Sequence, residues 1–300
     1  QKRRLNQFRN KLQRAQRMAH LDGATRKKKQ KKSKKTKINA SQNHNPILSE
    51  GSKMLELESG TNPYFKEYNR IVGEFPEDMN RLVDPALPGG DLRRALLFDM
   101  LPDQMPEKYA WAIPDERALR IIKHFSPITE VACGKGYWGK LLLDRGVDWI
   151  GYDTKKADEF WARVRFGGPE KLLQEGKDTK DRTLLLCYPD DFENDMNSVA
   201  LKCLENFKGS TIIHIGEMMP NTHMENPWGK TTSTDFQLEL AHSFHKVIQV
   251  SLPSWPLTID TLTVWKRSKR IEIDEMELRH IPEEERIDLA QSCSSLKHLL

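Results

Sequence analysis

The sequence has few cysteines and no long apolar segment. Its four cysteines show no CxxC pair and no regular spacing, which argues against a cysteine-built zinc site and favours a reduced, intracellular protein. No run of about 18 apolar residues occurs, so no transmembrane segment is expected. With 300 residues, of which 37% are hydrophobic, the chain can form one sizeable α/β domain with extensions.

Acidic residues are almost absent from the first 40 positions. Residues 1–40 carry a net charge of +15, whereas the remaining 260 residues carry −10. The stretch TRKKKQKKSKKTK (25–37) is too charged to fold alone and is expected to neutralise RNA or DNA phosphates, with RNA as the first candidate. The residues predicted to bind RNA are Arg26, Lys27, Lys28, Lys29, Lys31, Lys32, Lys34 and Lys35. A nuclear import signal or a solvated tail would have the same composition.

Four regions are predicted along the chain. They are a basic nucleic-acid-binding arm (1–40), a wrapping extension (41–107), an α/β domain (108–267) and a charged helical tail (268–300). From about Pro114, apolar strands alternate with helical patterns, which is typical of a doubly wound, mostly parallel sheet. The helix DFQLELAHSFH (235–245) is followed by two successive strands, KVIQVSL and IDTLTVWK, which predict an antiparallel edge.

The segment ACGKG (132–136) follows the first predicted strand and opens the next helix. Ligands of open α/β sheets bind beside this turn, at the carboxyl ends of the strands. Gly134 and Gly136 allow close backbone approach, and Asp153 ends the next strand, where a carboxylate can accept from both ribose hydroxyls. The spacing is not the G-x-G-x-x-G of dinucleotide binders. A strand, turn and helix that bind no nucleotide remain the alternative.

The pattern E-x-A-x-G-x-G from Glu130 to Gly136 resembles the E/D-x-G-x-G-x-G turn of S-adenosylmethionine-dependent methyltransferases. Longer blocks, from WAIP (111–114) through GYW (136–138) to SWPLTIDTLTVWKR, look like a little-characterised methyltransferase-like family over residues 108–267. This resemblance implies a Rossmann-like methyltransferase sheet whose last strand inserts antiparallel. It also implies S-adenosylmethionine as cofactor, bound by Glu130, Ala132, Cys133, Gly134, Lys135, Gly136 and Asp153.

The chain departs from the family pattern in two places. Ala132 replaces the first glycine of the turn and adds a methyl group close to the expected cofactor. After the fourth strand, where the family commonly has W-P-P-Y, the chain reads YPDD over residues 188–191. By analogy with amino-methylating enzymes that carry related loops, Tyr188 and Pro189 are expected to border the target. Glu217 follows the predicted strand STIIHIG at the sheet edge that faces the cofactor, and the resemblance makes it a further residue expected to border the target.

The remaining polar candidates have simpler interpretations. Asp190 and Asp191 could be a general base or a metal pair, but we interpret them as residues of a solvated turn after a strand, which need no function. His242 and His245 lie three apart on a predicted helix, a spacing that suits two metal ligands. No carboxylate or cysteine completes such a set, so these histidines and His223 are interpreted as surface residues, and no metal site is predicted.

The sequence therefore predicts a methyltransferase-fold protein associated with structured RNA, with ribosomal RNA as the first candidate, that either methylates it or assists ribosome assembly. Ribosomal or assembly-factor proteins are the expected protein partners. The alternatives are a non-catalytic structural component of a ribonucleoprotein and a methyltransferase that acts on proteins. An Arg-rich first helix and a start at Gln1 favour a mitochondrial location, whereas the basic arm also suits a nucleus or nucleolus.

Overall fold

The computed structural model describes residues 47–74, 104–174, 181–190, 197–218, 231–255 and 258–268. All of these belong to one compact unit, residues 45–300. The predicted arm (1–40) and all but the first residue of the predicted tail (268–300) lie outside the described residues. Among the described helices, none combines the length and the apolar character needed to cross a bilayer.

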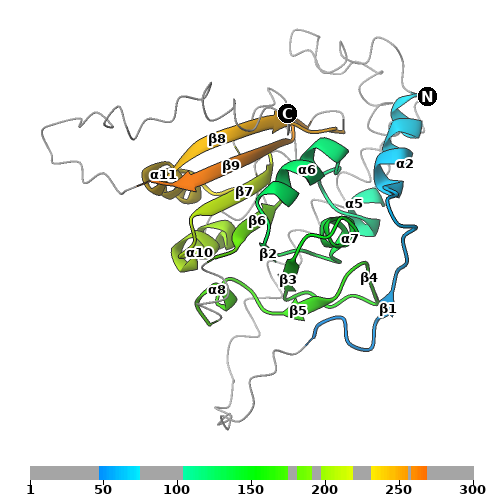
Figure 1. The fold of residues 1–300 in the computed structure, drawn as a ribbon, viewed down its shortest axis with the longest axis horizontal. Coiled ribbons are helices and arrows are strands. Elements are labelled where there is room, and N and C mark those ends of the chain that lie inside the picture. Colours follow the sequence, from blue (N-terminus) through cyan, green and yellow to red (C-terminus); the bar gives the residue numbers. More distant parts are fainter. Residues whose placement is uncertain are drawn as a thin grey trace, which may run out of the picture. The chain divides into compact units, whose positions relative to one another are not determined.

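A seven-stranded sheet with the order β5-β3-β2-β6-β7-β9-β8 forms the centre of this unit (Figure 1). Its parallel strands are β2 (Ile128–Val131), β3 (Trp149–Asp153), β5 (Val164–Phe166), β6 (Thr183–Cys187) and β7 (Thr211–Gly216). The strand β9 (Thr261–Arg267) inserts between β7 and β8 (Phe244–Ser251) and is antiparallel to both. This order confirms the predicted mostly parallel, Rossmann-like methyltransferase sheet with an antiparallel last strand.

Helices cover both faces of the sheet, and alternate strand residues point to opposite faces. On one face, α6 (Glu116–His124) and α7 (Tyr137–Leu143) share a hydrophobic core with Leu185 of β6. On the other face, α8 (Lys171–Gln174), α10 (Val199–Asn206) and α11 (Thr234–Ser243) share a second core with Leu184 and Leu186. Because both faces are covered, β6 (TLLLC) and β7 (TIIHIG) are largely apolar along their whole length.

The helix predicted over 235–245 is shorter than expected. The helix α11 ends at Ser243, and β8 begins at Phe244, which pairs with Arg267 and is buried in the core. His242 therefore lies on a helix and His245 on a strand, so the prediction that they share one helical face was wrong. Sheet pairing outweighs the local helical pattern at this point. His223 lies outside the described residues.

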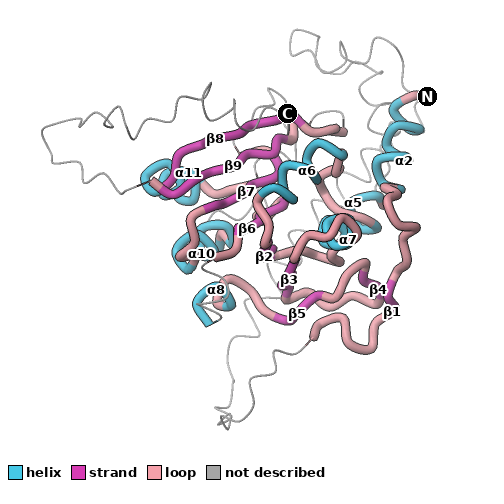
Figure 2. The backbone as a smooth tube through the Cα atoms, viewed as in Figure 1, coloured by secondary structure: helices cyan, strands magenta, loops and turns pink. Residues whose placement is uncertain are grey.

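The segment 47–74 runs along the α/β domain, mostly as loop (Figure 2). Its short strand β1 (Lys53–Met54) pairs in parallel with β4 (Glu159–Phe160). Its helix α2 (Pro63–Val72) contacts the loop after β8, because the Tyr68 hydroxyl donates to the carbonyl of Ser254 at 3.2 Å. A further short helix, α5 (Met105–Lys108), precedes α6.

Candidate functional site

A pocket of about 330 Å³ lies at the carboxyl ends of β2, β3 and β6, where open α/β sheets bind their ligands. This volume is at the lower end of the range for small-molecule sites. Six of the seven predicted cofactor residues line the pocket: Glu130, Ala132, Cys133, Gly134, Lys135 and Asp153. Gly136 does not line it. Of the predicted target residues, Tyr188 lines the pocket, whereas Pro189 and Glu217 do not.

The carboxylate of Asp153 is bonded directly to the glycine turn. The Gly134 amide donates to Oδ2 at 2.8 Å, and the Lys155 amide donates to Oδ1 at 2.7 Å. These two backbone donors fix a side chain that is only 9% exposed. Since a carboxylate oxygen has more than one lone pair, both oxygens can still accept from a neighbouring diol such as ribose.

Three residues of the turn have left-handed backbone conformation: Ala132 (φ 60°), Gly134 (φ 57°) and Gly136 (φ 77°). A Cβ on Gly136 would lie 3.1 Å from the Ala162 Cβ and 3.2 Å from the Val164 Cγ2, so a side chain there would crowd its neighbours in addition to straining the backbone. A Cβ on Gly134 would meet nothing within 4 Å, and the backbone angle alone explains this glycine. At Ala132 the same conformation costs about 1–2 kcal/mol.

Glu130 places a buried carboxyl group in the pocket wall. The side chain is 2% exposed, and the Trp149 indole donates to its Oε2 at 2.8 Å. Burial raises the pKa of Glu130 to about 8, against the effect of this hydrogen bond, and the nearby Asp153 raises it further. Because a cation beside a buried carboxyl favours its charged form, this wall suits a ligand with a positively charged group.

Two cysteines, Cys133 after β2 and Cys187 at the end of β6, also line the pocket. Burial raises the pKa of both thiols, and the neighbouring Glu130 adds to the effect. Both thiols therefore stay protonated at neutral pH and act as small apolar wall residues rather than nucleophiles.

Trp111 and Tyr188 contribute a pair of aromatic rings to the pocket lining. The Tyr188 ring stacks on that of Trp111, with centroids 6.0 Å apart and an interplanar angle of 17°. The Tyr188 hydroxyl donates to Oδ1 of Asp260. Burial raises the pKa of Asp260 to about 7 despite this hydrogen bond, and the neighbouring Glu217 adds to the shift. Glu217 is itself fully buried and accepts from the Ile259 amide.

Sequence reasoning assigned no role to Trp111 or Asp260. Asp260 lies 72 positions after Tyr188, and only the strand order brings the two together. Trp111 belongs to the WAIP segment, which the sequence resemblance had already singled out. The sequence could not show, however, that the ring of Trp111 is exposed.

Asp190 stabilises the start of a helix, so its interpretation as a solvated turn residue was wrong. Its Oδ1 accepts from the amides of Val199 and Ala200, and its Oδ2 accepts from the Ser198 hydroxyl at 2.6 Å. Such a carboxylate satisfies free amides of the first turn of α10 and favours the helix dipole. Asp191 lies outside the described residues. Among those described, no three His, Cys, Asp or Glu side chains gather as a metal site.

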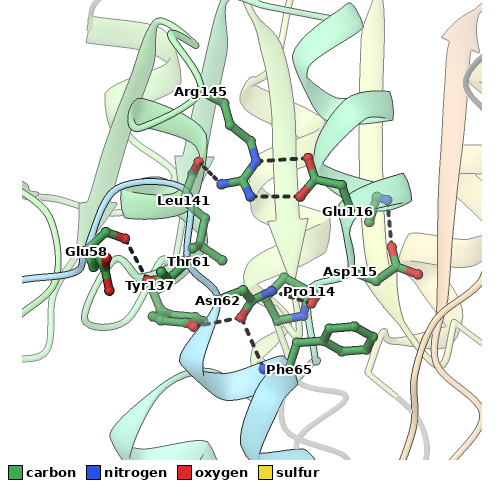
Figure 3. Close-up of polar contacts among 11 residues, drawn as sticks. Glu58, Thr61, Asn62, Phe65, Pro114, Asp115, Glu116, Tyr137, Leu141 and Arg145 are labelled. Carbon is green, nitrogen blue, oxygen red and sulfur yellow. Dashed lines mark hydrogen bonds and ion pairs between the residues drawn. The ribbon is translucent and has the colours of Figure 1, made fainter. Parts of the chain in front are cut away.

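The segment before the domain holds the helix that follows the glycine turn (Figure 3). The Tyr137 hydroxyl donates to Oδ1 of Asn62 at 2.9 Å and accepts from the Tyr64 amide at 3.1 Å. Asn62 also accepts from the Phe65 amide and donates from Nδ2 to the carbonyl of Pro114 at 2.8 Å. Because Tyr137 is the first residue of α7, these contacts fix the position at which the turn ends.

A second contact in Figure 3 joins α6 to the end of α7. The Arg145 guanidinium donates to both carboxylate oxygens of Glu116, at 2.8 and 3.2 Å, and to the carbonyl of Leu141. This contact joins α6 and α7, the helices that precede and follow β2 along the chain.

No family model and no curated protein matches this chain. Among solved structures, it is similar to the 1,6-didemethyltoxoflavin-N1-methyltransferase of Burkholderia thailandensis with S-adenosylhomocysteine, with a TM-score of 0.37, 12% identity, and coverage of 62% of this chain and 92% of that one. It is also similar to the magnesium protoporphyrin IX methyltransferase of Synechocystis, with a TM-score of 0.35, 12% identity, and coverage of 68% of this chain and 94% of that one. A third similar structure is the tRNA (uracil-54, C5)-methyltransferase of Pyrococcus abyssi, with a TM-score of 0.33, 16% identity, and coverage of 51% of this chain and 38% of that one.

The strand order carries the structural conclusion, because the antiparallel β9 inserted between β7 and β8 is the feature that the sequence resemblance implied. The described part of the chain therefore has the Rossmann-like fold of the S-adenosylmethionine-dependent methyltransferases.

Proposed function

We propose that this protein is an S-adenosylmethionine-dependent methyltransferase that acts on RNA. The observation that carries this proposal is the carboxylate of Asp153, which is fixed by the Gly134 amide and lines the same pocket as the buried Glu130. A ribose-binding acceptor and a cation-binding acceptor in one cavity match the two ends of an adenosyl amino acid.

The residues present fit this cofactor. Asp153 would accept from the ribose hydroxyls, Glu130 would face the ammonium group, and Lys135 would attract the carboxylate. When bound, the cofactor supplies an electrophilic methyl group on a sulfonium. The protein then contributes orientation and electrostatics: a fixed turn, a preformed wall, and a target side bordered by Tyr188.

The basic arm supports RNA as the substrate class. Residues 1–40 carry a net charge of +15, whereas the rest of the chain is acidic, so attraction to phosphates is concentrated in one segment. We further propose that the target is ribosomal RNA and that the protein partners are ribosomal proteins or assembly factors. The proposed location is the mitochondrion.

A non-catalytic scaffold in a ribonucleoprotein is the second candidate, and two observations favour it. Ala132 keeps a strained backbone and a methyl group where the family commonly has glycine. Asp190, at the position of the family's second proline, caps a helix instead of contacting a target. A scaffold of this kind would keep the sheet without needing to bind the cofactor.

Calorimetry with S-adenosylmethionine separates the two candidates. We expect the full chain to bind it, and Asp153→Ala to weaken binding roughly 10- to 100-fold, since hydrogen bonds to a charged group are lost. Asp158→Ala, an exposed carboxylate outside the pocket lining, is the matched control and should leave the affinity unchanged. Absence of binding by the wild-type chain at millimolar cofactor would contradict the enzyme and favour the scaffold.

A further inference from the structure

We propose that Trp111 and Tyr188 form a stacking platform for an unstacked nucleobase of single-stranded RNA. The two residues line the pocket that is proposed to hold the cofactor. The inference rests on the proposed function, because it names the substrate class of that same site. It adds Trp111 as the residue that recognises this substrate.

Trp111 combines an exposed ring with an anchored backbone. The residue is 48% exposed, although the two residues that follow it, Ala112 and Ile113, are fully buried. The apolar ring is thus held at the pocket edge by its neighbours and cannot withdraw into the core. An exposed aromatic ring beside a cavity is the kind of surface on which a flat ligand gains contact area.

Tyr188 supplies the second ring of the platform and is held at three points. Its ring stacks on Trp111, its amide donates to the carbonyl of Ile215 at 2.9 Å, and its hydroxyl donates to Asp260. Its backbone has a φ of 49°, which is costly for a residue with a side chain and is kept only where the surroundings impose it. The two rings therefore form a preorganised surface, so little conformational entropy of these side chains is lost when a ligand binds.

The positive charges of three lysines in the pocket lining favour a flat ligand that carries negative charge. Lys155 and Lys156 are exposed, Lys135 is half-buried, and all three line the pocket. None of them forms an ion pair with another residue of the described ranges. The exposed acid of the lining is Glu107. Lysines beside stacked aromatic rings are complementary to a base with its phosphates, as in single-strand-binding grooves.

A protein substrate fits this rim less well. The side chains that accept methyl groups in proteins are chiefly Lys and Arg, and three lysines at the rim would repel them. A base inside a duplex is excluded for a different reason, since its faces are covered by its neighbours and a platform can reach it only after it has left the stack. An unpaired base in a loop or at an end is the occupant that meets both conditions.

The test uses the full chain and a trinucleotide with 2-aminopurine at its centre, whose fluorescence is quenched by stacking. This probe is needed because the chain has seven tryptophans, so intrinsic fluorescence would not report on Trp111 alone. About 0.3 M salt suppresses contacts made by the arm. Titrations are run with and without saturating S-adenosylhomocysteine, whose own affinity is measured by calorimetry.

Wild-type protein should quench the probe, and Trp111→Leu should weaken binding roughly 5- to 150-fold, the range for loss of one stacked base. Trp111→Phe keeps an aromatic face and should restore most of the affinity. Leu238→Ala, which truncates another exposed apolar side chain, on α11, should behave as wild type. The affinity of Leu238→Ala for S-adenosylhomocysteine should equal that of the wild type, and calorimetry on the Trp111 variants shows whether each still binds this ligand.

The outcomes separate this inference from the proposed function. If S-adenosylhomocysteine binds but Trp111→Leu holds the trinucleotide as tightly as wild type, the platform is wrong and the cofactor site stands. If S-adenosylhomocysteine does not bind but the probe is still quenched in a Trp111-dependent way, the stacking platform is supported and the proposed methyltransferase activity is not. Displacement of the probe by a lysine-containing peptide, at a tighter affinity than the trinucleotide, overturns RNA as the occupant.

Discussion

The backbone amide of Gly134 donates a hydrogen bond to Oδ2 of Asp153 at 2.8 Å, although the two residues lie 19 positions apart. This bond joins the turn after β2 to the end of β3, which are neighbouring parallel strands. It makes the acid and the turn one rigid unit, so a ligand held by Asp153 also lies against the glycine backbone. The account of cofactor binding depends on this unit.

The first prediction concerns protons. Because burial raises the pKa of Glu130 to about 8, its carboxyl is mostly protonated at pH 7 in the free protein. A bound ammonium would favour the charged form, so cofactor binding should release close to one proton per site. Calorimetry in buffers of different ionisation enthalpy measures this number.

In Glu130→Gln the proton release should disappear, and binding should weaken roughly 10-fold or more. Glu107→Gln is the matched control, because that acid also lines the pocket but is exposed at its rim. Equal proton release from the wild type and Glu130→Gln would show that Glu130 does not face the cation.

The second prediction concerns strain at Ala132. Replacing it with glycine removes the cost of a φ of 60° but adds chain entropy to the unfolded state, so Ala132→Gly should stabilise the protein by about 0.5–1 kcal/mol. Urea unfolding measures the difference. The same change at Ala118, which is fully buried in α6, should instead destabilise by about 1–2 kcal/mol, because the loss of a buried methyl group adds to the lower helix propensity of glycine. Destabilisation by Ala132→Gly would mean that its methyl group packs to advantage.

The third prediction concerns the contact between Tyr137 and Asn62. Tyr137→Phe removes the hydroxyl that bonds both Asn62 and the Tyr64 amide, and should cost about 1–2 kcal/mol of unfolding free energy. It should also weaken cofactor binding, since the turn loses a support at its end.

Tyr68→Phe is the control for this effect. It also removes one tyrosine hydroxyl bond from α2, the one to the Ser254 carbonyl, but at a site away from the turn. Its stability should fall by about 1 kcal/mol while its cofactor affinity stays at the wild-type value. Cofactor affinities that change equally in the two variants would exclude a specific role for Tyr137.

The fourth prediction is a pH dependence of stability from Asp260. Its pKa rises from the ordinary 3.8 to about 7 on folding, in contact with Tyr188 and near Glu217. The folded state therefore holds the proton more tightly, and the unfolding free energy that Asp260 contributes should fall as pH rises from about 4 to 7. Asp260→Asn should remove this part of the slope, so the variant gains stability relative to wild type as pH increases. Parallel pH profiles of the two proteins in urea unfolding would contradict it.

The fifth prediction concerns the arm. The logarithm of RNA affinity should fall linearly with the logarithm of salt concentration, because each phosphate contact releases counterions. Deleting residues 1–40, which carry the +15 charge, should remove most of this slope and most of the affinity. A salt-independent interaction would identify a protein as the partner of the arm instead.

The sheet could be predicted because its strands are apolar runs separated by helical patterns, and period and length identify both. Gly134 and Asp153 could also be predicted, since both follow strands at the same sheet edge. Asp260 could not, because its partner Tyr188 is 72 residues away and only the inserted β9 brings them together. The end of α11 was misplaced because pairing of Phe244 with Arg267 outweighs a local helical pattern.

The central claim is that Asp153 binds the ribose of an adenosyl cofactor, and a crystal structure of the full chain with S-adenosylhomocysteine tests it most directly. We predict the ligand in the pocket between Gly134 and Tyr188, with both ribose hydroxyls within about 3 Å of the Asp153 carboxylate. A pocket that stays empty at millimolar ligand, or a ribose bound away from Asp153, would contradict the claim.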